Sequence, residues 1–242
     1  MKFADITEAT PAQAGKGAKK KRVVIVEDQR MVAEFLASHC TQLGLEVVAR
    51  CSTCETGLAA VLAHRPELLL LDISLPDGDG LQVATIAMLQ SPLTKVLAIS
   101  GHRDAWTMLQ VQRLGLHGYV DKTEQRTEVL SEAIHAVLAG QIYYTPVVNE
   151  SSAHLRRDPK AFIHVLSDYE LRVLALIGES KSDDEIAATL NVTASTVQSR
   201  RRDIMRKLDI HSTPKLIHYA IMHGVTRPDK LAAVRVDLNA TS

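Results

Sequence analysis

The sequence predicts an α/β domain built on a parallel sheet, followed by a small domain made only of helices. Two observations support this prediction. Over residues 22–140, short runs of β-branched and aliphatic residues alternate with segments of helical period, the pattern of parallel strands joined by helices. After residue 160 the strand signals stop, and only helical segments remain.

The third strand of the first domain is the clearest. Four consecutive leucines at 68–71 stand between Pro66 and a Pro-Asp-Gly turn, as expected for a strand buried on both faces. The other strands are expected at 23–26, 47–49, 96–99 and 119–120, so that strands recur roughly every 24 residues.

Helices are expected between these strands and after the last one. Ser52 and Glu55 form a capping box for the second helix, and Gly140 would end the fifth. Five strands and five helices predict a flavodoxin-like doubly wound domain over residues 22–140. The expected helices span residues 30–43, 53–64, 80–90, 104–114 and 124–139.

The helical domain is expected at 161–226 and contains four helices. Ser167 with Glu170, and Ser182 with Glu185, form capping boxes for the first two. Thr193 would cap a third helix that runs to residue 208, and the fourth spans 214–223 before Gly224. Two helices split by a tight break, the second rich in arginine, are typical of a helix-turn-helix. The remaining segments are expected to be a disordered tail (1–21), a linker (141–160) and a frayed tail (227–242).

The charge distribution separates the two domains, although the whole chain of 242 residues has 28 basic and 28 acidic side chains. Residues 22–140 carry 9 basic against 14 acidic side chains, a net charge of −5. Residues 195–208 carry 5 basic against 1 acidic, a net charge of +4. An acidic half with a concentrated basic helix indicates a sensing or catalytic module joined to an anion-binding one.

Several classes of protein are excluded by the same sequence. No apolar run reaches the roughly 18 residues of a membrane span, and no apolar segment follows the N-terminal charges as in a secretory signal. Three cysteines are too few for a disulfide framework, and we expect Cys51 and Cys54 to pack in the protein. Cytoplasm is therefore the expected compartment.

Polar side chains stand at the carboxyl ends of four predicted strands: Glu27 and Asp28, then Asp72, Ser100 and Lys122. In a doubly wound sheet these ends meet at one edge, where ligands bind. Acidic clusters with open positions suit Mg²⁺. Beside this ion the Asp72 carboxylate can attack a phosphoryl group, with Lys122 supplying a fixed positive charge and Ser100 a hydroxyl.

This arrangement resembles the receiver domain of bacterial two-component response regulators, and residues 22–226 together resemble the NarL/FixJ subfamily. The motifs that carry the resemblance are Glu27-Asp28, Asp72-Ile-Ser-Leu-Pro76 with Gly80, Ser100-Gly101, and Gly118-Tyr119-Val-Asp-Lys122. The resemblance implies that Asp72 accepts the phosphoryl group. It also implies that Asp28 and Asp72 bind Mg²⁺ directly, Glu27 through water, and the Ser74 backbone carbonyl completes the site.

The same resemblance implies a switch made by Ser100 and Tyr119, in which the hydroxyl moves to the phosphoryl group and the ring turns inward. His102, two residues after Ser100, would lie near the phosphoryl group. We expect phosphorylation to favour dimerisation through the last strands and helices and to free the helix-turn-helix from the receiver.

The C-terminal domain resembles the LuxR-type helix-turn-helix, through Leu166-Ser-Asp-Tyr-Glu170, Asp184-Glu-Ile-Ala187 and the segment from Thr196-Val197 to Ile204-Met-Arg-Lys-Leu208. Its third helix would enter the major groove, with Val197, Ile204 and Leu208 facing the core, and its fourth would pair two copies on half-sites. The expected DNA contacts are Thr193, Ser195, Thr196, Gln198, Ser199, Arg200, Arg202, Arg206 and Lys207.

Three residues depart from the family pattern. Arg200 stands where histidine is common, which bears on base preference, because an arginine can bind a guanine edge bidentately. Tyr169 stands where arginine is common, which we expect to affect local packing. Glu27 replaces a common aspartate, a tolerable change where a ligand acts through water.

The function expected is a DNA-binding transcriptional response regulator and not an enzyme. A sensor histidine kinase would donate the phosphoryl group to Asp72, the phosphorylated chain would form a homodimer on double-stranded promoter DNA, and RNA polymerase is a candidate partner. One alternative is a phosphorylation-independent DNA binder or adaptor whose receiver only dimerises. Another is an aspartyl-phosphate phosphatase or phosphotransferase, but haloacid-dehalogenase-like enzymes have a second acid where this chain has Ser74.

Overall fold

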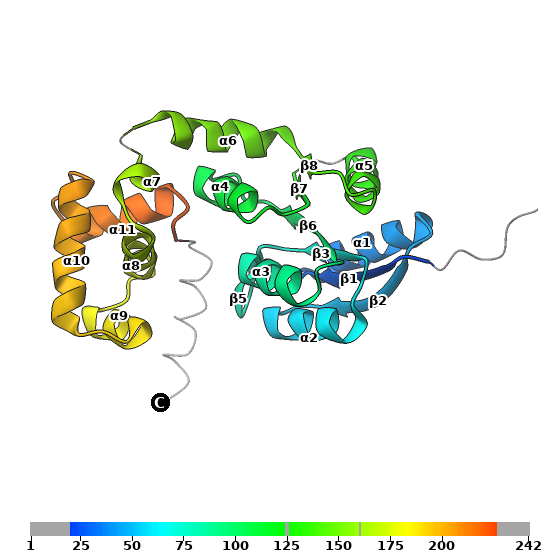
Figure 1. Cartoon of the computed structure of the whole chain (residues 1–242), viewed down its shortest axis with the longest axis horizontal. Helices are drawn as coiled ribbons and strands as arrows, with labels where there is room; N and C mark the ends of the chain where they lie inside the picture. Colours follow the sequence, from blue (N-terminus) through cyan, green and yellow to red (C-terminus); the bar gives the residue numbers. More distant parts are fainter. Residues whose placement is uncertain (1–19, 124–125, 160, 227–242) are drawn as a thin grey trace, which may run out of the picture.

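The computed structural model describes residues 20–123, 126–159 and 161–226. The α/β domain and the helical domain lie beside each other and are connected along one edge by a helix (Figure 1). The tails expected at 1–21 and 227–242 lie outside the described residues, except for residues 20 and 21.

The five predicted strands form a parallel sheet together with one further strand, in the order β2-β1-β3-β6-β7-β8. A sixth strand, β8 (Tyr143–Tyr144), pairs with β7 and comes from the segment expected to be a linker. A small antiparallel hairpin of β4 (Ser74–Leu75) and β5 (Gly78–Asp79) follows the central strand. The predicted strands are β1 (Arg22–Val26), β2 (Glu46–Cys51), β3 (Leu68–Leu71), β6 (Lys95–Ser100) and β7 (Gly118–Asp121).

The core of this domain has two layers, one on each face of the sheet. Strand β3 contributes to both, because alternate side chains of a strand point to opposite faces. Leu69 and Leu71 pack with residues of α2, α3 and α4, whereas Leu68 and Leu70 pack with residues of α1 and α5. The prediction of a strand buried on both faces is confirmed.

Five helices cover the sheet as predicted, although the start of the last one differs. Residues 124 and 125, predicted to open that helix, lie outside the described residues. The helices are α1 (Arg30–Gln42), α2 (Cys54–His64), α3 (Gly80–Gln90), α4 (Ala105–Arg113) and α5 (Thr127–Leu138).

The capping box predicted at Ser52 and Glu55 is wrong, because the helix is capped one residue later. The cap of α2 is Thr53, whose hydroxyl accepts from the Thr56 amide at 3.2 Å. The Asp77 carboxylate, from the hairpin turn, accepts from the first amides of the helix, those of Cys54 at 2.7 Å and Glu55 at 3.1 Å. A residue distant in sequence thus satisfies free amides at the start of the helix, including that of Glu55, which the predicted capping box would have satisfied.

The expected linker is largely helical, so the prediction of an irregular segment is wrong. Helix α6 (Pro146–Arg157) packs along α4 and connects the two domains. Val148 and Ser152 are fully buried there, and the Ser152 hydroxyl donates to the Gln112 side chain of α4 at 3.0 Å. Packing on α4 accompanies the helical order of this segment, whose own sequence is mostly polar.

In the helical domain, the four predicted helices and both capping boxes are confirmed. Gly224 follows the last of them with φ +70°, the left-handed conformation that favours glycine. One short helix, α7 (Phe162–Val165), was not predicted. No helix of the described ranges has the length and apolar character of a membrane span. The predicted helices are α8 (Asp168–Gly178), α9 (Asp183–Leu190), α10 (Ala194–Lys207) and α11 (Thr213–Met222).

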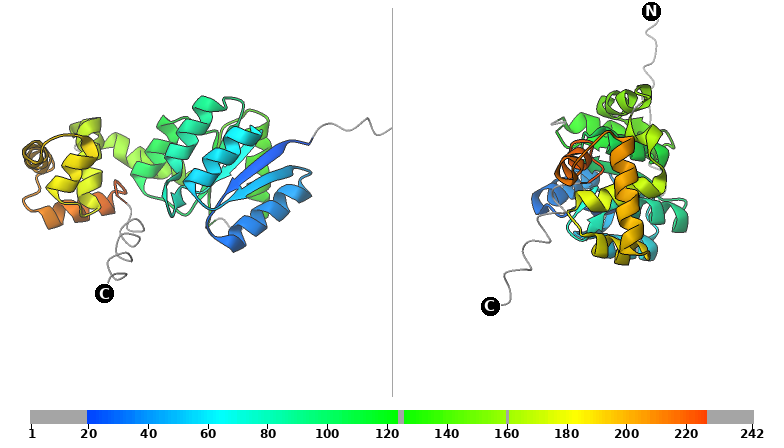
Figure 2. Two further views of the ribbon diagram at one scale, coloured as in Figure 1. Left: turned by 90° about the horizontal axis from the view of Figure 1, so that it is seen from below. Right: turned by 90° about the vertical axis from the view of Figure 1, so that its left-hand side faces the viewer.

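The two domains meet at α4, not at the basic helix. Trp106 of α4 packs edge-on against Phe162 of α7, with ring centroids 5.5 Å apart, and Phe162 in turn contacts Tyr219 of α11 and His223. Helix α10 lies at the end of the molecule away from the sheet (Figures 1 and 2). The expectation that the α/β domain covers this helix in the resting protein therefore does not fit this structure.

Gly80, the first residue of α3, provides a test of how the hairpin is held beside Asp72. A Cβ at this position would lie 2.2 Å from the Asp72 carbonyl oxygen and 2.8 Å from the Ile73 Cα. We expect Gly80→Ala to lower the free energy of unfolding by about 1–3 kcal/mol, the usual cost of overpacking, in urea titrations. Gly101→Ala is the control, because a Cβ there would meet nothing within 4 Å. Equal stability of the two variants would contradict this packing.

Candidate metal centre and nucleic-acid interface

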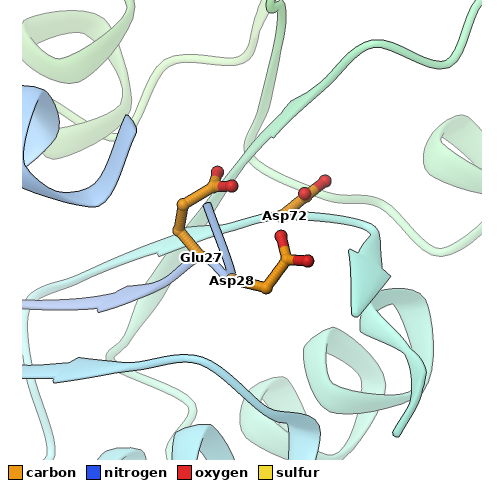
Figure 3. A group of neighbouring side chains, drawn as sticks. All are labelled: Glu27, Asp28 and Asp72. Carbon is orange, nitrogen blue, oxygen red and sulfur yellow. The ribbon is translucent and has the colours of Figure 1, made fainter. Parts of the chain in front are cut away.

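Three carboxylates meet at the carboxyl edge of the sheet. Glu27 and Asp28 follow β1, Asp72 follows the neighbouring β3, and one oxygen of each lies within 4.8 Å of the others (Figure 3). Backbone pairing continues past the strands and fixes this geometry, since the Asp72 amide donates to the Val26 carbonyl at 2.8 Å. Glu27 and Asp72 are buried and Asp28 is exposed, so the cluster opens to solvent on one side.

Lys122, just after β7, brings an ammonium group into the same cluster. Its Nζ donates to Asp72 Oδ2 at 2.7 Å and to Glu27 Oε1 at 3.0 Å. Burial alone would lower the pKa of Lys122, but the hydrogen bonds to Asp72 and Glu27 outweigh it, so the pKa is raised. Burial raises the pKa of Glu27, and the hydrogen bond from Lys122 offsets this only in part. The lysine is thus held as a cation.

The charges and donors around Asp72 fit a divalent cation and a phosphoryl group. The three carboxyl groups outnumber the single ammonium, and oxygen-only donors are those that Mg²⁺ prefers. The Ser100 hydroxyl is buried and has no hydrogen-bond partner within the described part of the chain, so it is available to a phosphoryl oxygen. The Ser74 amide donates to Asp72 Oδ1 at 3.1 Å; the role of the Ser74 carbonyl stays a prediction.

Tyr119 and Ser100, predicted to act as a pair, are in contact. The Tyr119 ring is already fully buried in this structure, so the inward turn predicted for it is not a change that remains to be made here. Its hydroxyl donates to the carbonyls of Ser100, at 3.1 Å, and His102. The His102 ring reaches across to the Ser74 hydroxyl, with Nε2 and Oγ 2.5 Å apart. The loop after β6 is therefore connected both to Tyr119 and to the residue two positions after Asp72. Nothing in the sequence indicated the Ser74 contact.

The exposed face of α10 carries most of the predicted nucleic-acid contacts. Val197 and Ile204 are buried in the core of the helical domain and Leu208 packs against it, as predicted. Thr193 caps the helix by accepting from the Thr196 amide at 3.3 Å. The exposed side chains among those predicted are Thr193, Ser195, Gln198, Ser199, Arg200, Arg202, Arg206 and Lys207.

Some basic side chains of α10 are already engaged within the domain. Arg201 pairs with Asp183 of α9, with Nη2 and Oδ1 2.5 Å apart, and is only 15% exposed. Lys207 Nζ donates to both carboxylate oxygens of Glu170, at 2.7 and 2.8 Å. Arg206 pairs with Asp203 on the same helix. Lys207 therefore stabilises the packing of α10 on α8, and its contact with nucleic acid stays a prediction.

Comparisons with known proteins give a match for the α/β domain and for the helical domain. Residues 23–134 match the family described as response regulator receiver domain, and residues 164–220 match bacterial regulatory proteins of the luxR family. Oxygen regulatory protein NreC of Staphylococcus haemolyticus is 31% identical over 210 residues, which covers 83% of this chain and 96% of that protein. NreC of Staphylococcus aureus strain JH9 has the same identity and coverage.

Two solved structures share the fold. A complex of the two-component response regulator RcsB with DNA has a TM-score of 0.56 at 21% identity, covering 84% of this chain and 99% of that one. RcsB of Salmonella enterica serovar Typhimurium, bound to promoter rprA with phosphomimetic BeF₃⁻, has a TM-score of 0.57 at 24% identity, covering 83% and 98%.

The pair between Lys207 and Glu170 can be tested by stability. The Glu170 side chain is 5% exposed, so Lys207→Met leaves a buried carboxylate without its ammonium. We expect the free energy of unfolding to fall by about 1–3 kcal/mol, measured by urea titration followed by circular dichroism. Arg206→Met is the control, because Arg206 is 77% exposed and such surface pairs contribute only about 0–1 kcal/mol.

The pH dependence of this loss has a definite sign. Burial opposes ionisation of Glu170, but the hydrogen bonds from Lys207 and Ser167 outweigh it, so the pKa of Glu170 is lowered. A lowered pKa in the folded state stabilises the protein above the unfolded pKa, and this contribution disappears as the pH falls through the folded value. The deficit of Lys207→Met should therefore shrink on acidification; a deficit independent of pH would contradict the ion pair.

Proposed function

The chain belongs to the bacterial response regulators that join a receiver domain to a LuxR-type DNA-binding domain, and we propose that phosphorylation of Asp72 controls its binding to promoter DNA. The observation that carries this proposal is the contact of 2.7 Å between Asp72 and Lys122, in a cluster with Glu27 and Asp28. Here a buried carboxylate is held beside a cation. The neighbouring strand β6 ends at Ser100, whose buried hydroxyl has no hydrogen-bond partner among the described residues.

The chemistry proposed is transfer of a phosphoryl group from a phosphohistidine of a sensor kinase. Glu27, Asp28 and Asp72, with the Ser74 carbonyl, would hold Mg²⁺, which when bound neutralises the charge that the phosphoryl group brings. A carboxylate oxygen of Asp72 attacks the phosphorus, the phosphorus–nitrogen bond breaks, and the imidazole keeps the electron pair and takes up a proton. Lys122 and Ser100 then bind phosphoryl oxygens.

The kinase is expected to bind beside α1. Met31 and Phe35 of this helix are 84% and 48% exposed, an unusual position for large apolar side chains. They line a cavity of 440 Å³ that also includes Lys122 and Arg126. A protein that delivers a phosphoryl group to Asp72 must sit at this rim, so an apolar surface here suits a protein donor.

Transmission to the DNA-binding domain is proposed to run through α4. The loop that follows Ser100 contains His102 and leads directly into α4, where Trp106 contacts Phe162. Because α10 already faces solvent, we infer that phosphorylation acts on this contact and on pairing of two copies through α11, whose Met222 is 66% exposed. A dimer would place two recognition helices on the two halves of a promoter site.

The acceptor is tested with acetyl phosphate and Mg²⁺. We expect radiolabel in the wild-type chain and none in Asp72→Asn, because the amide cannot form the acyl phosphate. Asp209→Asn should label normally, since the Asp209 side chain is 95% exposed and lies in the DNA-binding domain. Equal labelling of Asp72→Asn would overturn the assignment of the acceptor.

The same proteins distinguish the alternative functions. DNA binding that is equal in wild type and Asp72→Asn, with and without acetyl phosphate, would favour a phosphorylation-independent DNA binder. Steady release of phosphate from a non-protein substrate would favour an enzyme.

The contact between domains can be followed by fluorescence, because Trp106 is the only tryptophan of the chain. We expect Mg²⁺ with BeF₃⁻ to change the Trp106 emission in the wild type, since the loop after Ser100 leads into α4. Asp72→Asn should show no change under the same conditions. An emission spectrum that is identical with and without BeF₃⁻ in the wild type would contradict this route.

A further inference from the structure

Arg200 of the basic helix is held by an aromatic ring from another helix. Its guanidinium carbon lies 6.0 Å from the centroid of the Tyr169 ring, at the start of α8. Tyr169 is partly buried against the core of the helical domain, so its position is fixed by packing. Arg200 itself is 48% exposed and accessible to a ligand on the outer face of α10.

This contact differs in kind from the ion pairs that three other basic side chains of α10 make. Arg201, Arg206 and Lys207 each have a carboxylate within 2.8 Å, which neutralises their charge. The nearest carboxylate of Arg200 is that of Asp203, at 4.0 Å, and Arg206 contacts the same carboxylate at 2.8 Å. The ring face of a tyrosine attracts a cation but leaves its charge and its N–H donors available.

A guanidinium that is oriented in this way loses less conformational entropy when it binds a ligand. A free arginine side chain loses rotamer freedom when it binds, which weakens its binding. A planar guanidinium that is already oriented suits bidentate recognition of a guanine edge, whereas phosphate contacts tolerate a mobile side chain. The contact with Tyr169 thus bears on sequence preference more than on overall affinity.

We propose that Tyr169 is a positioning residue for sequence recognition, which holds the Arg200 guanidinium for contact with a guanine in each half-site of the promoter. This inference rests on the proposed function, because it requires that α10 enters the major groove.

The test uses the full chain with Mg²⁺ and BeF₃⁻. Duplexes that bind the protein are selected from a random library and identified by sequencing. Arg200→Ala is expected to lose the guanine preference at one base pair of each half-site. Tyr169→Met, which fills the space without a ring face, should weaken the same preference by about three- to thirtyfold. Tyr169→Phe keeps the ring and should retain the preference, and Tyr169→Met should have no further effect on the Arg200→Ala variant.

Two results would overturn the proposal. In the first, Tyr169→Met lowers binding to all duplexes alike and leaves the base preference intact, as a purely structural role would. In the second, Tyr169→Met changes the preference equally in the wild-type and Arg200→Ala chains. Folding of each variant is checked by circular dichroism, and Tyr169→Leu replaces Tyr169→Met if that variant unfolds. A wild-type chain that selects no sequence would overturn the proposed function itself, and the inference with it.

Discussion

The ion cluster of Lys122 with Asp72 and Glu27 is the interaction on which the rest of the account depends. Three carboxylates at one sheet edge repel one another, and two of them are buried, so a single ammonium at 2.7 Å from Asp72 compensates them only in part. Such a site is sensitive to any added charge, whether from a cation or from a phosphoryl group. The parallel order of the strands brings these residues together from distant parts of the chain.

A continuous set of contacts leads from this cluster to the DNA-binding domain. The Ser74 hydroxyl contacts His102, the Tyr119 hydroxyl contacts the His102 carbonyl, and the same loop continues into α4. Trp106 then meets Phe162 in the second domain. Because α10 faces away from the receiver (Figure 2), we propose that a change at Asp72 reaches DNA through the placement of the helical domain and not by uncovering α10.

The sequence was sufficient for the features that depend on local patterns. The four leucines of β3 and the polar residues after each strand predicted the sheet and the cluster around Asp72, because burial and strand ends leave local signals. Strand β8 and helix α6 were missed because their order comes from packing on β7 and α4. The contact of Asp77 with the first amides of α2 and the contact of Arg200 with Tyr169 were also missed, because each joins residues that are distant in the sequence.

The central claim is that charge added at Asp72 changes the affinity of a distant surface for DNA. The most direct test measures binding of the full chain to a duplex obtained by selection, with Mg²⁺ alone, BeF₃⁻ alone and both together. The account predicts that affinity rises only when both are present, by about 5- to 150-fold, the usual range of coupling between two sites. An affinity that is the same under all three conditions would contradict it.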